Sequence, residues 1–235
     1  MATSGKVGGF LPSTSGFRFP NSFPRVPLRR IGVPGVVSVP IGDASNGLCG
    51  GMAFAARDLF EAGRPPPTDT SPPAEGSPLY AHLVERLLVS FDLPFGPVRY
   101  LELMSPALPD GETIWSRFGL APHGRAWRIA MQEWPKVRAD IDAGHPSPLG
   151  LVQAISTDPF DLKENHQVLA YAYWASPGTV TLRIYDPNLP GRDDVKLTFE
   201  PSPSATARPL VRREPPSAPI HAFFRVPYPP ASPPT

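Results

Sequence analysis

Residues 165–188, NHQVLAYAYWASPGTVTLRIYDPN, decide the fold that we expect for this chain. The segment 165–176 alternates between inward and outward positions, and 179–188 is rich in β-branched and aromatic residues. Both patterns predict β-strands. Pro177-Gly178 between them is typical of a turn. The sequence therefore predicts an antiparallel hairpin.

The open end of this hairpin carries an imidazole and a carboxylate. Positions that pair across the turn sum to about 355, so the partner of His166 falls near residue 189. Asp186 and Asn188 lie within reach of that end if the register is off by a small amount. Hairpin geometry alone thus predicts that the Asp186 carboxylate lies beside the His166 ring.

The rest of the chain divides into a helical front half and a strand-rich back half. Helices are expected over 49–63, 77–91 and 125–144, the last with a break at Pro135. Further strands are expected over 147–156, 194–201 and 219–228. Helices followed by an antiparallel sheet indicate the α+β class.

Cys49 is the only cysteine, and it stands in NGLCGG (46–51) directly before the first predicted helix. Backbone N–H groups and the helix dipole at a helix N-terminus favour a thiolate over a thiol. Gly50 and Gly51 each cost about 1 kcal/mol in a helix relative to alanine. Two of them in the first turn indicate that the sheet half or a substrate chain approaches the backbone closely.

Each of these residues has a purely structural interpretation when taken alone. A free cysteine such as Cys49 is commonly a small buried hydrophobe. His166 is equally suited to capping a strand edge, and Asp186-Pro187 is typical of a turn. Together the three side chains form a set in which a base activates a nucleophile and a third group orients the base. We therefore favour Cys49 as nucleophile, His166 as base and Asp186 as the orienting group.

Composition excludes several other functions. The chain has 235 residues, a net charge of +1 and scattered basic residues, which is not the charge distribution of a nucleic-acid-binding protein. No metal is expected, because a single cysteine and no histidine pair at ligand spacing are present. We also expect no membrane span and no signal peptide, and therefore a cytoplasmic or non-classically exported protein.

Several stretches resemble the papain-like cysteine peptidase superfamily. They are the CG that opens a helix, DAGHPSPLGLV (142–152), NHQVLAYAY (165–173) and IYDPN (184–188), and the resemblance covers residues 43 to about 190. The chain is most similar to the bacteriocin-processing peptidases that cleave double-glycine leaders. The resemblance implies a helical lobe packed against an antiparallel sheet lobe, with Cys49, His166 and Asp186 as the catalytic triad.

One position departs from the family pattern. The family has a glutamine six residues before the cysteine, where its amide helps to form the oxyanion hole, and this chain has Asp43 there. Asn46 and Ser45 are the candidates to replace that amide, with support from Gly50 and Asn188. Loss of one oxyanion donor typically costs about 10²–10³ in rate. A slow enzyme, an enzyme of changed specificity and an inactive relative all remain open.

These observations predict one papain-like domain over 46–228, divided at about residue 145 into a helical lobe (46–145) and a sheet lobe (146–228). A Pro/Gly-rich arm (1–45) precedes it and a Pro-rich tail (229–235) follows it. The expected function is hydrolysis of peptide or amide bonds in a peptide or protein substrate, without a cofactor. The alternatives are an inactive papain-like binding module, and a protein deamidase or acyltransferase.

Other candidate residues are interpreted as structural. We expect His82 to be exposed on a helix, His123 and His145 to lie in turns, and His221 to begin a late strand without an acidic partner. The tryptophans are expected to build the core and the lobe interface; they are Trp115, Trp127, Trp134 and Trp174. Three phenylalanines in the arm are expected to wrap the domain, with a prosegment across the cleft as the alternative; they are Phe17, Phe19 and Phe23.

Overall fold

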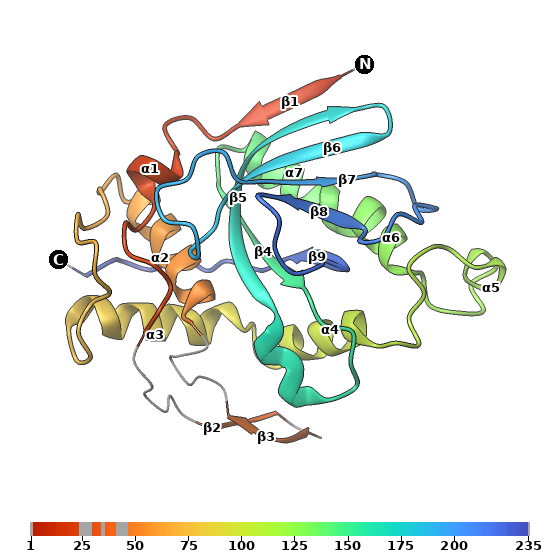
Figure 1. The fold of residues 1–235 in the computed structure, drawn as a ribbon, viewed down its shortest axis with the longest axis horizontal. Helices are drawn as coiled ribbons and strands as arrows, with labels where there is room; N and C mark the ends of the chain where they lie inside the picture. The colour runs from red at the N-terminus through yellow and green to blue at the C-terminus, as the bar shows by residue number, and fades with distance from the viewer. Residues whose placement is uncertain (1, 24–29, 34–35, 41–46, 235) are drawn as a thin grey trace.

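The computed structural model of the chain describes residues 2–23, 30–33, 36–40 and 47–234. It shows a mixture of helices and strands built around an antiparallel, curled seven-stranded sheet (Figure 1). The strands follow the order β8-β7-β6-β5-β4-β9, and β1 also pairs with β5. A separate two-stranded ribbon consists of β2 and β3.

The predicted division into helices and a late sheet is observed, with additional short elements. The helices are α1 (Pro12–Ser15), α2 (Cys49–Glu61), α3 (Pro78–Ser90), α4 (Phe95–Met104), α5 (Ile114–Arg117), α6 (Arg125–Trp127), η2 (Arg128–Glu133), α7 (Trp134–Asp142) and η3 (Pro159–Glu164). The strands are β1 (Thr3–Lys6), β2 (Arg30–Val33), β3 (Val36–Pro40), β4 (Ser147–Val152), β5 (His166–Ser176), β6 (Thr179–Tyr185), β7 (Lys196–Phe199), β8 (Val211–Glu214) and β9 (Ala222–Arg225). The sequence did not predict β1, β2, β3 and β8.

The β5–β6 hairpin has the predicted turn and nearly the predicted register. From Ser176↔Thr179 to Ala172↔Arg183 the paired residue numbers sum to 355, and beyond a bulge at Tyr171 they sum to 354. A slip of one residue moves every side chain to the opposite face of a strand. Because of this bulge, Asp186 follows β6 on the same side as His166, whereas the unshifted register would have put Tyr185 there.

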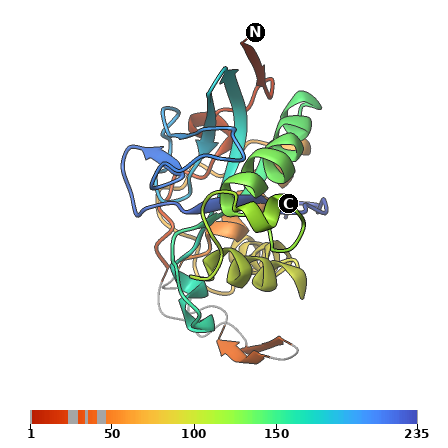
Figure 2. The same ribbon diagram turned by 90° about the vertical axis from the view of Figure 1, so that its right-hand side faces the viewer.

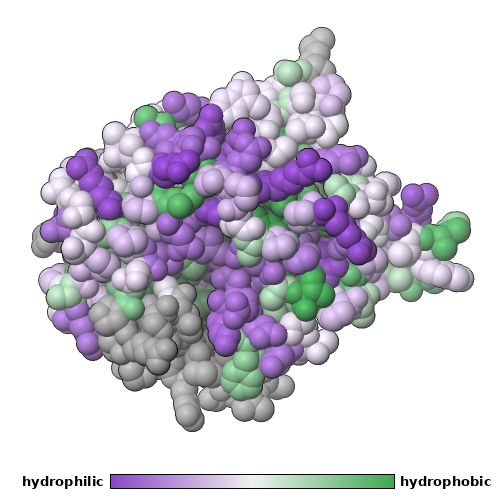
Figure 3. Space-filling view, in the orientation of Figure 1, coloured by the Kyte–Doolittle hydropathy of each residue, from purple (hydrophilic) through white to green (hydrophobic). Residues whose placement is uncertain are grey.

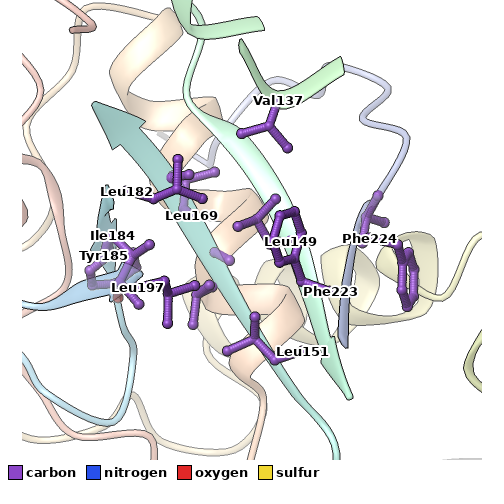
Figure 4. Close-up of a cluster of buried hydrophobic side chains, with 14 of the residues drawn as sticks. Val137, Leu149, Leu151, Leu169, Leu182, Ile184, Tyr185, Leu197, Phe223 and Phe224 are labelled. Carbon is purple, nitrogen blue, oxygen red and sulfur yellow. The ribbon is translucent and has the colours of Figure 1, made fainter. Parts of the chain in front are cut away.

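Strand β5 is the centre of the core. Residues His166–Tyr173 are buried on both faces, so the predicted half-exposed alternation is wrong for this stretch. Helix α2 packs against β5, while α7 packs against four strands, β1, β4, β5 and β9. Figure 2 shows α7 lying alongside the sheet, with α3 below it. Figure 4 shows Val137 of α7 above the apolar side chains that the strands contribute, among them Leu149 and Leu169.

Helices α2 and α3 form at the positions expected from their sequence signals. Ser77 caps α3, because its Oγ accepts a hydrogen bond from the Tyr80 N–H at 3.2 Å, and Pro78 follows in the first turn. Gly63, with φ of +65°, follows the end of α2. The two helices pack so closely that a Cβ on Gly51 would lie 2.1 Å from the Leu83 carbonyl oxygen.

The helix expected over 125–144 is interrupted where its proline predicted a break. Six residues directly before Trp134, Arg128–Glu133, form a π-helical segment, and α7 then continues to Asp142. Pro135 has no N–H to bond to a carbonyl one turn earlier, and a local widening of the helix absorbs that loss. Gly144, with φ of +85°, terminates the segment as expected.

The described part of the N-terminal arm belongs to the core. Thr3–Lys6 forms β1, which pairs with the second half of β5. Phe17 and Phe19 are fully buried and Phe23 is 5% exposed. These side chains therefore wrap and fill the domain, as the favoured interpretation predicted.

The prediction that His82 is exposed is wrong. Its side chain is 8% exposed, and its Nε2 lies 3.2 Å from Oδ2 of the fully buried Asp58. Arg86 Nε lies 2.8 Å from the same oxygen, and the Tyr228 hydroxyl donates to Oδ1. A buried carboxylate needs such partners, and here they fasten the chain at Tyr228 to helices α2 and α3.

The tryptophans do not all belong to the core. Trp134 is 8% exposed, but Trp115 and Trp174 are 61% and 51% exposed, so the prediction is wrong for these two. Trp115 lies on α5, which projects at the right of Figure 1 and carries apolar, green surface in Figure 3. Trp174 lies on β5 just beyond the buried stretch that ends at Tyr173, where the strand becomes exposed.

Replacing Gly51 by alanine tests the close packing of α2 and α3. A methyl group there meets a backbone carbonyl, which cannot rotate away, so we expect Gly51→Ala to lower the free energy of unfolding by about 1–3 kcal/mol. Urea denaturation followed by circular dichroism measures the change. Gly8→Ala is the control, because nothing lies within 4 Å of a Cβ at Gly8. Equal stabilities of the two variants would show that the contact is not tight.

Candidate active site

Cys49 is the first residue of α2 and is half-buried. Gly47 precedes it in a left-handed conformation, with φ of +88°, which turns the chain into the helix. Leu48 occupies the N-cap position and provides no capping side chain. The N–H groups of a first helical turn have no partners within the helix, so the thiol stands at a positively polarised helix end, as the sequence predicted.

His166 is the first residue of β5 and its side chain is 10% exposed. Its Nε2 lies 2.9 Å from Oδ1 of Asp186, the residue that follows β6. With Nε2 engaged by the carboxylate, Nδ1 is the ring nitrogen that is left for the thiol. The predicted pairing of His166 with Asp186 is therefore present, and it presents the basic nitrogen away from the carboxylate.

Cys49 and His166 lie close enough to influence each other's ionisation. Burial by itself raises the pKa of the Cys49 thiol, but the charge of His166 and a hydrogen bond to its ring lower it. The N–H groups of Gln167 and Gly50 lower it further, and together these effects hold the thiol pKa below its ordinary value. The arrangement thus favours a thiolate–imidazolium pair over the neutral pair.

The imidazole shows the complementary shift. Burial by itself lowers the pKa of His166, but the negative charges of Asp186 and Cys49 raise it to about 10. A raised histidine pKa means that the imidazolium form is favoured by the folded state below that pH. The contribution of this protonation to stability is present in full below about pH 6.5 and is lost as the pH rises through about 10.

Asp186 is fully buried and is satisfied on both oxygens. Oδ1 accepts from His166 and, at 2.8 Å, from the Asn188 N–H; Oδ2 accepts from the Arg213 guanidinium. Burial by itself raises the pKa of the carboxyl, but His166, then Arg213 and the Asn188 N–H, hold it below its ordinary value. Asp186 is therefore a carboxylate and not a hydrogen-bond donor to the ring.

Arg213 is a member of this cluster that the sequence did not reveal. It lies on β8, and its side chain is 10% exposed. The segment VRREPP carries no alternation that marks a strand, and its two adjacent arginines look equivalent. The structure separates them, because Arg212 faces solvent and Arg213 faces Asp186.

Gly50, directly after Cys49, has two close neighbours. A Cβ on Gly50 would lie 2.3 Å from Ser90 Oγ and 2.7 Å from Gln167 Oε1. Gly50 therefore allows the start of α2 to approach both α3 and the sheet strand β5. This matches the predicted close approach of the sheet half, and α3 is the neighbour that the sequence did not indicate.

The predicted supporting residues have different outcomes. The Asn188 backbone contacts Asp186 as described, while the Asn188 side chain accepts a hydrogen bond at 3.0 Å from Asn21 Nδ2. Asn46, Ser45 and Asp43 lie outside the described residues. Asn21 was missed because it sits in the arm, within PNSFP, where no local pattern connects it to the hairpin.

The remaining histidines belong to other parts of the molecule. His123 stacks on Trp127 at 3.7 Å between ring centroids and pairs with Glu112 at 3.0 Å. His145 lies 3.0 Å from Glu61. Both therefore have acidic partners in addition to the turn positions that were predicted, and neither contacts the cluster around Cys49.

A cavity of about 590 Å³ lies between the loop after α2, the start of α3 and the C-terminal prolines. His82, Phe19 and Arg64 are among its lining residues, and Cys49, His166 and Asp186 are not. Arg64 donates hydrogen bonds to the carbonyls of Pro233 and Pro234, at 3.1 and 2.7 Å. The cavity is therefore separate from the candidate active site.

Within the described ranges, no group of three or more His, Cys, Asp or Glu side chains is placed to hold a metal ion. The helices described here are also too short or too polar for any of them to cross a membrane.

Comparison with known proteins adds no assignment. No family model matches the chain, and no curated protein or solved structure matches it either.

The buried ion pair between Arg213 and Asp186 predicts a large difference between two neighbouring arginines. Arg213→Gln leaves the Asp186 charge without its buried cation, so we expect the free energy of unfolding to fall by about 3–5 kcal/mol. Arg212→Gln, on the exposed side of the same strand, is expected to change it by less than about 0.5 kcal/mol. Urea denaturation at pH 7 measures both, and equal stabilities would contradict the ion pair.

Proposed function

We propose that this protein is a cysteine-dependent hydrolase of peptide or amide bonds, with a papain-like arrangement of a helical lobe and a sheet lobe. The observation that carries the proposal is the proximity of the Cys49 thiol to the His166 ring, together with the 2.9 Å pairing of His166 Nε2 with Asp186. The three groups come from α2, β5 and the loop after β6, so the tertiary fold brings them together.

In the proposed reaction, the Cys49 thiolate attacks the carbonyl carbon of the substrate and forms a tetrahedral oxyanion. First-turn N–H groups of α2 are suited to stabilise that charge. The His166 imidazolium then protonates the leaving nitrogen, and the C–N bond breaks to give a thioester and a free amine. His166 next takes a proton from water, the resulting hydroxide attacks the thioester, and the acid is released with regeneration of the thiolate–imidazolium pair.

Asp186 has a supporting role in this scheme. Its carboxylate fixes the ring orientation and stabilises the imidazolium that both half-reactions require. Transfer of the acyl group to an amine, or hydrolysis of a side-chain amide, uses the same thioester. A deamidase or acyltransferase therefore differs from a peptidase only in which amide is bound and which nucleophile accepts the acyl group.

Alkylation by iodoacetamide tests the thiolate. At about pH 6 an ordinary thiol is almost fully protonated and reacts slowly, whereas an ion-paired thiolate reacts fast. We expect fast labelling of Cys49 in the folded protein, and a rate lowered by about tenfold or more in His166→Ala. Because Cys49 is the only cysteine, Cys49→Ser is the blank. A thiol that reacts only after denaturation would contradict the proposal and leave a non-catalytic module.

The chemistry itself is tested by an activated ester. We expect p-nitrophenyl acetate to give a burst of nitrophenolate and an acetyl group on Cys49, detectable by mass spectrometry. Cys49→Ser abolishes the burst in this scheme, and added amines that capture the acyl group identify a transferase. Hydrolysis of an amide, unlike that of the ester, is expected to fall as the pH rises through about 10, since His166 then loses the proton that the leaving nitrogen needs. An alkaline limit that Asp186→Asn leaves unchanged counts against this assignment.

A further inference from the structure

We propose that Asn21 is a positioning residue that fixes the start of the Cys49 helix against the loop that carries Asp186. The inference rests on the proposed function, because it concerns the geometry of that same site. It assigns to the N-terminal arm, for which the sequence favoured a structural wrap, a direct part in assembling the nucleophile and its base.

The Asn21 residue is bonded to both segments at once. Its Oδ1 accepts a hydrogen bond from the Leu48 N–H at 2.6 Å, and Leu48 directly precedes Cys49. Its Nδ2 donates to Asn188 Oδ1 at 3.0 Å. Its backbone N–H donates to the Pro187 carbonyl at 3.2 Å. One planar amide therefore joins the residue before the thiol to the loop that follows β6.

Gly47 makes room for this amide. A Cβ on Gly47 would lie 2.3 Å from Asn21 Nδ2, and the φ of +88° at Gly47 is one that other residues rarely adopt. Two features thus require a glycine at position 47, its own backbone conformation and the Asn21 side chain that packs against it. Both features favour a fixed approach of Asn21 to the helix start.

The connection reaches the acid–base groups in one further step on each side. On the loop side, the Asn188 N–H donates to Asp186 Oδ1, which also accepts from His166. On the helix side, Leu48 is fully buried, so a shift of this residue moves the start of α2 as a whole. Gly50 against Gln167 is a second contact between the same helix and β5. Asn21 and the close approach at Gly50 therefore fix the start of α2 from two directions.

The charged groups around His166 determine what a displacement does. Cys49 faces it from α2 and Asp186 from the loop after β6, Arg213 of β8 acts through Asp186, and the Tyr100 hydroxyl of α4 lies 3.5 Å from its backbone carbonyl. Moving the Cys49 helix away removes one of the two negative charges that face the ring. The imidazolium then loses part of its stabilisation, and the thiolate loses its counter-ion.

The experiment compares Asn21→Ala with Ser22→Ala, an exposed neighbour in the same segment. The pKa of His166 is measured by NMR titration of ¹³C-labelled histidine, and the labelling rate of Cys49 with iodoacetamide at about pH 6. For Asn21→Ala we expect a His166 pKa lower by about one unit and a labelling rate lower by about tenfold. Ser22→Ala is expected to leave both at the wild-type values.

A folded Asn21→Ala variant, verified by circular dichroism, that keeps the wild-type pKa and labelling rate would overturn the proposal. Should this variant not fold, Asn188→Ala is measured instead, because the Asn188 side chain is exposed and loses only one bond. We expect it to lower the labelling rate about threefold, and no change overturns the proposal. If Asn21→Ala has both effects but the wild type forms no acyl-enzyme, the hydrolase assignment fails and the role of Asn21 stands.

Discussion

The buried carboxylate of Asp186 is the constraint on which the rest of the site depends. A fully buried charge is costly unless it is paired and hydrogen-bonded. Asp186 meets this requirement with donors from three segments, His166 of β5, the Asn188 N–H and Arg213 of β8. The loop after β6 must therefore stay closed over β5, and β8 must stay on the sheet. Because the partners are spread over the sheet, the orientation of the histidine ring is determined by the fold as a whole.

The bulge at Tyr171 shows how a small backbone irregularity determines chemistry. The turn at Pro177-Gly178 could be predicted from the sequence, and so could the approximate register. The one-residue shift could not, because a bulge depends on what packs on each face of the strand and not on a local signal. Because successive side chains of a strand point to opposite faces, this single residue decides whether Asp186 or Tyr185 faces His166. Sequence reasoning brought the right residues to the right end of the hairpin but could not fix the face.

Features that depend on local chemistry were predictable, and features that depend on distant segments were not. The start of α2 at Cys49, the Ser77 cap and the break before Pro135 follow from rules about neighbouring residues. Arg213 bonds to Asp186 and Asn21 bonds to Leu48, and each partner lies 27 residues away in the chain. Neither Arg213 nor Asn21 lies in a recognisable sequence pattern. His82 was misjudged for the same reason, since its partner Asp58 is on another helix.

The four ionisable groups of the cluster form a sequence of alternating charge, Arg213, Asp186, His166 and Cys49. Each member other than the two ends has an opposite charge on either side, and the set sums to zero. Burying such a set costs less than burying its members separately, because each field is cancelled at short range. The same alternation explains the directions of the shifts, since the pKa of His166 is raised between two anions and the pKa of Asp186 is lowered between two cations. Neutralising any one group leaves its neighbour uncompensated, so the thiolate at α2 depends on the arginine at β8 although the two do not touch. The lowered pKa of Cys49 is in this sense a property of the whole sheet and not of the helix end alone.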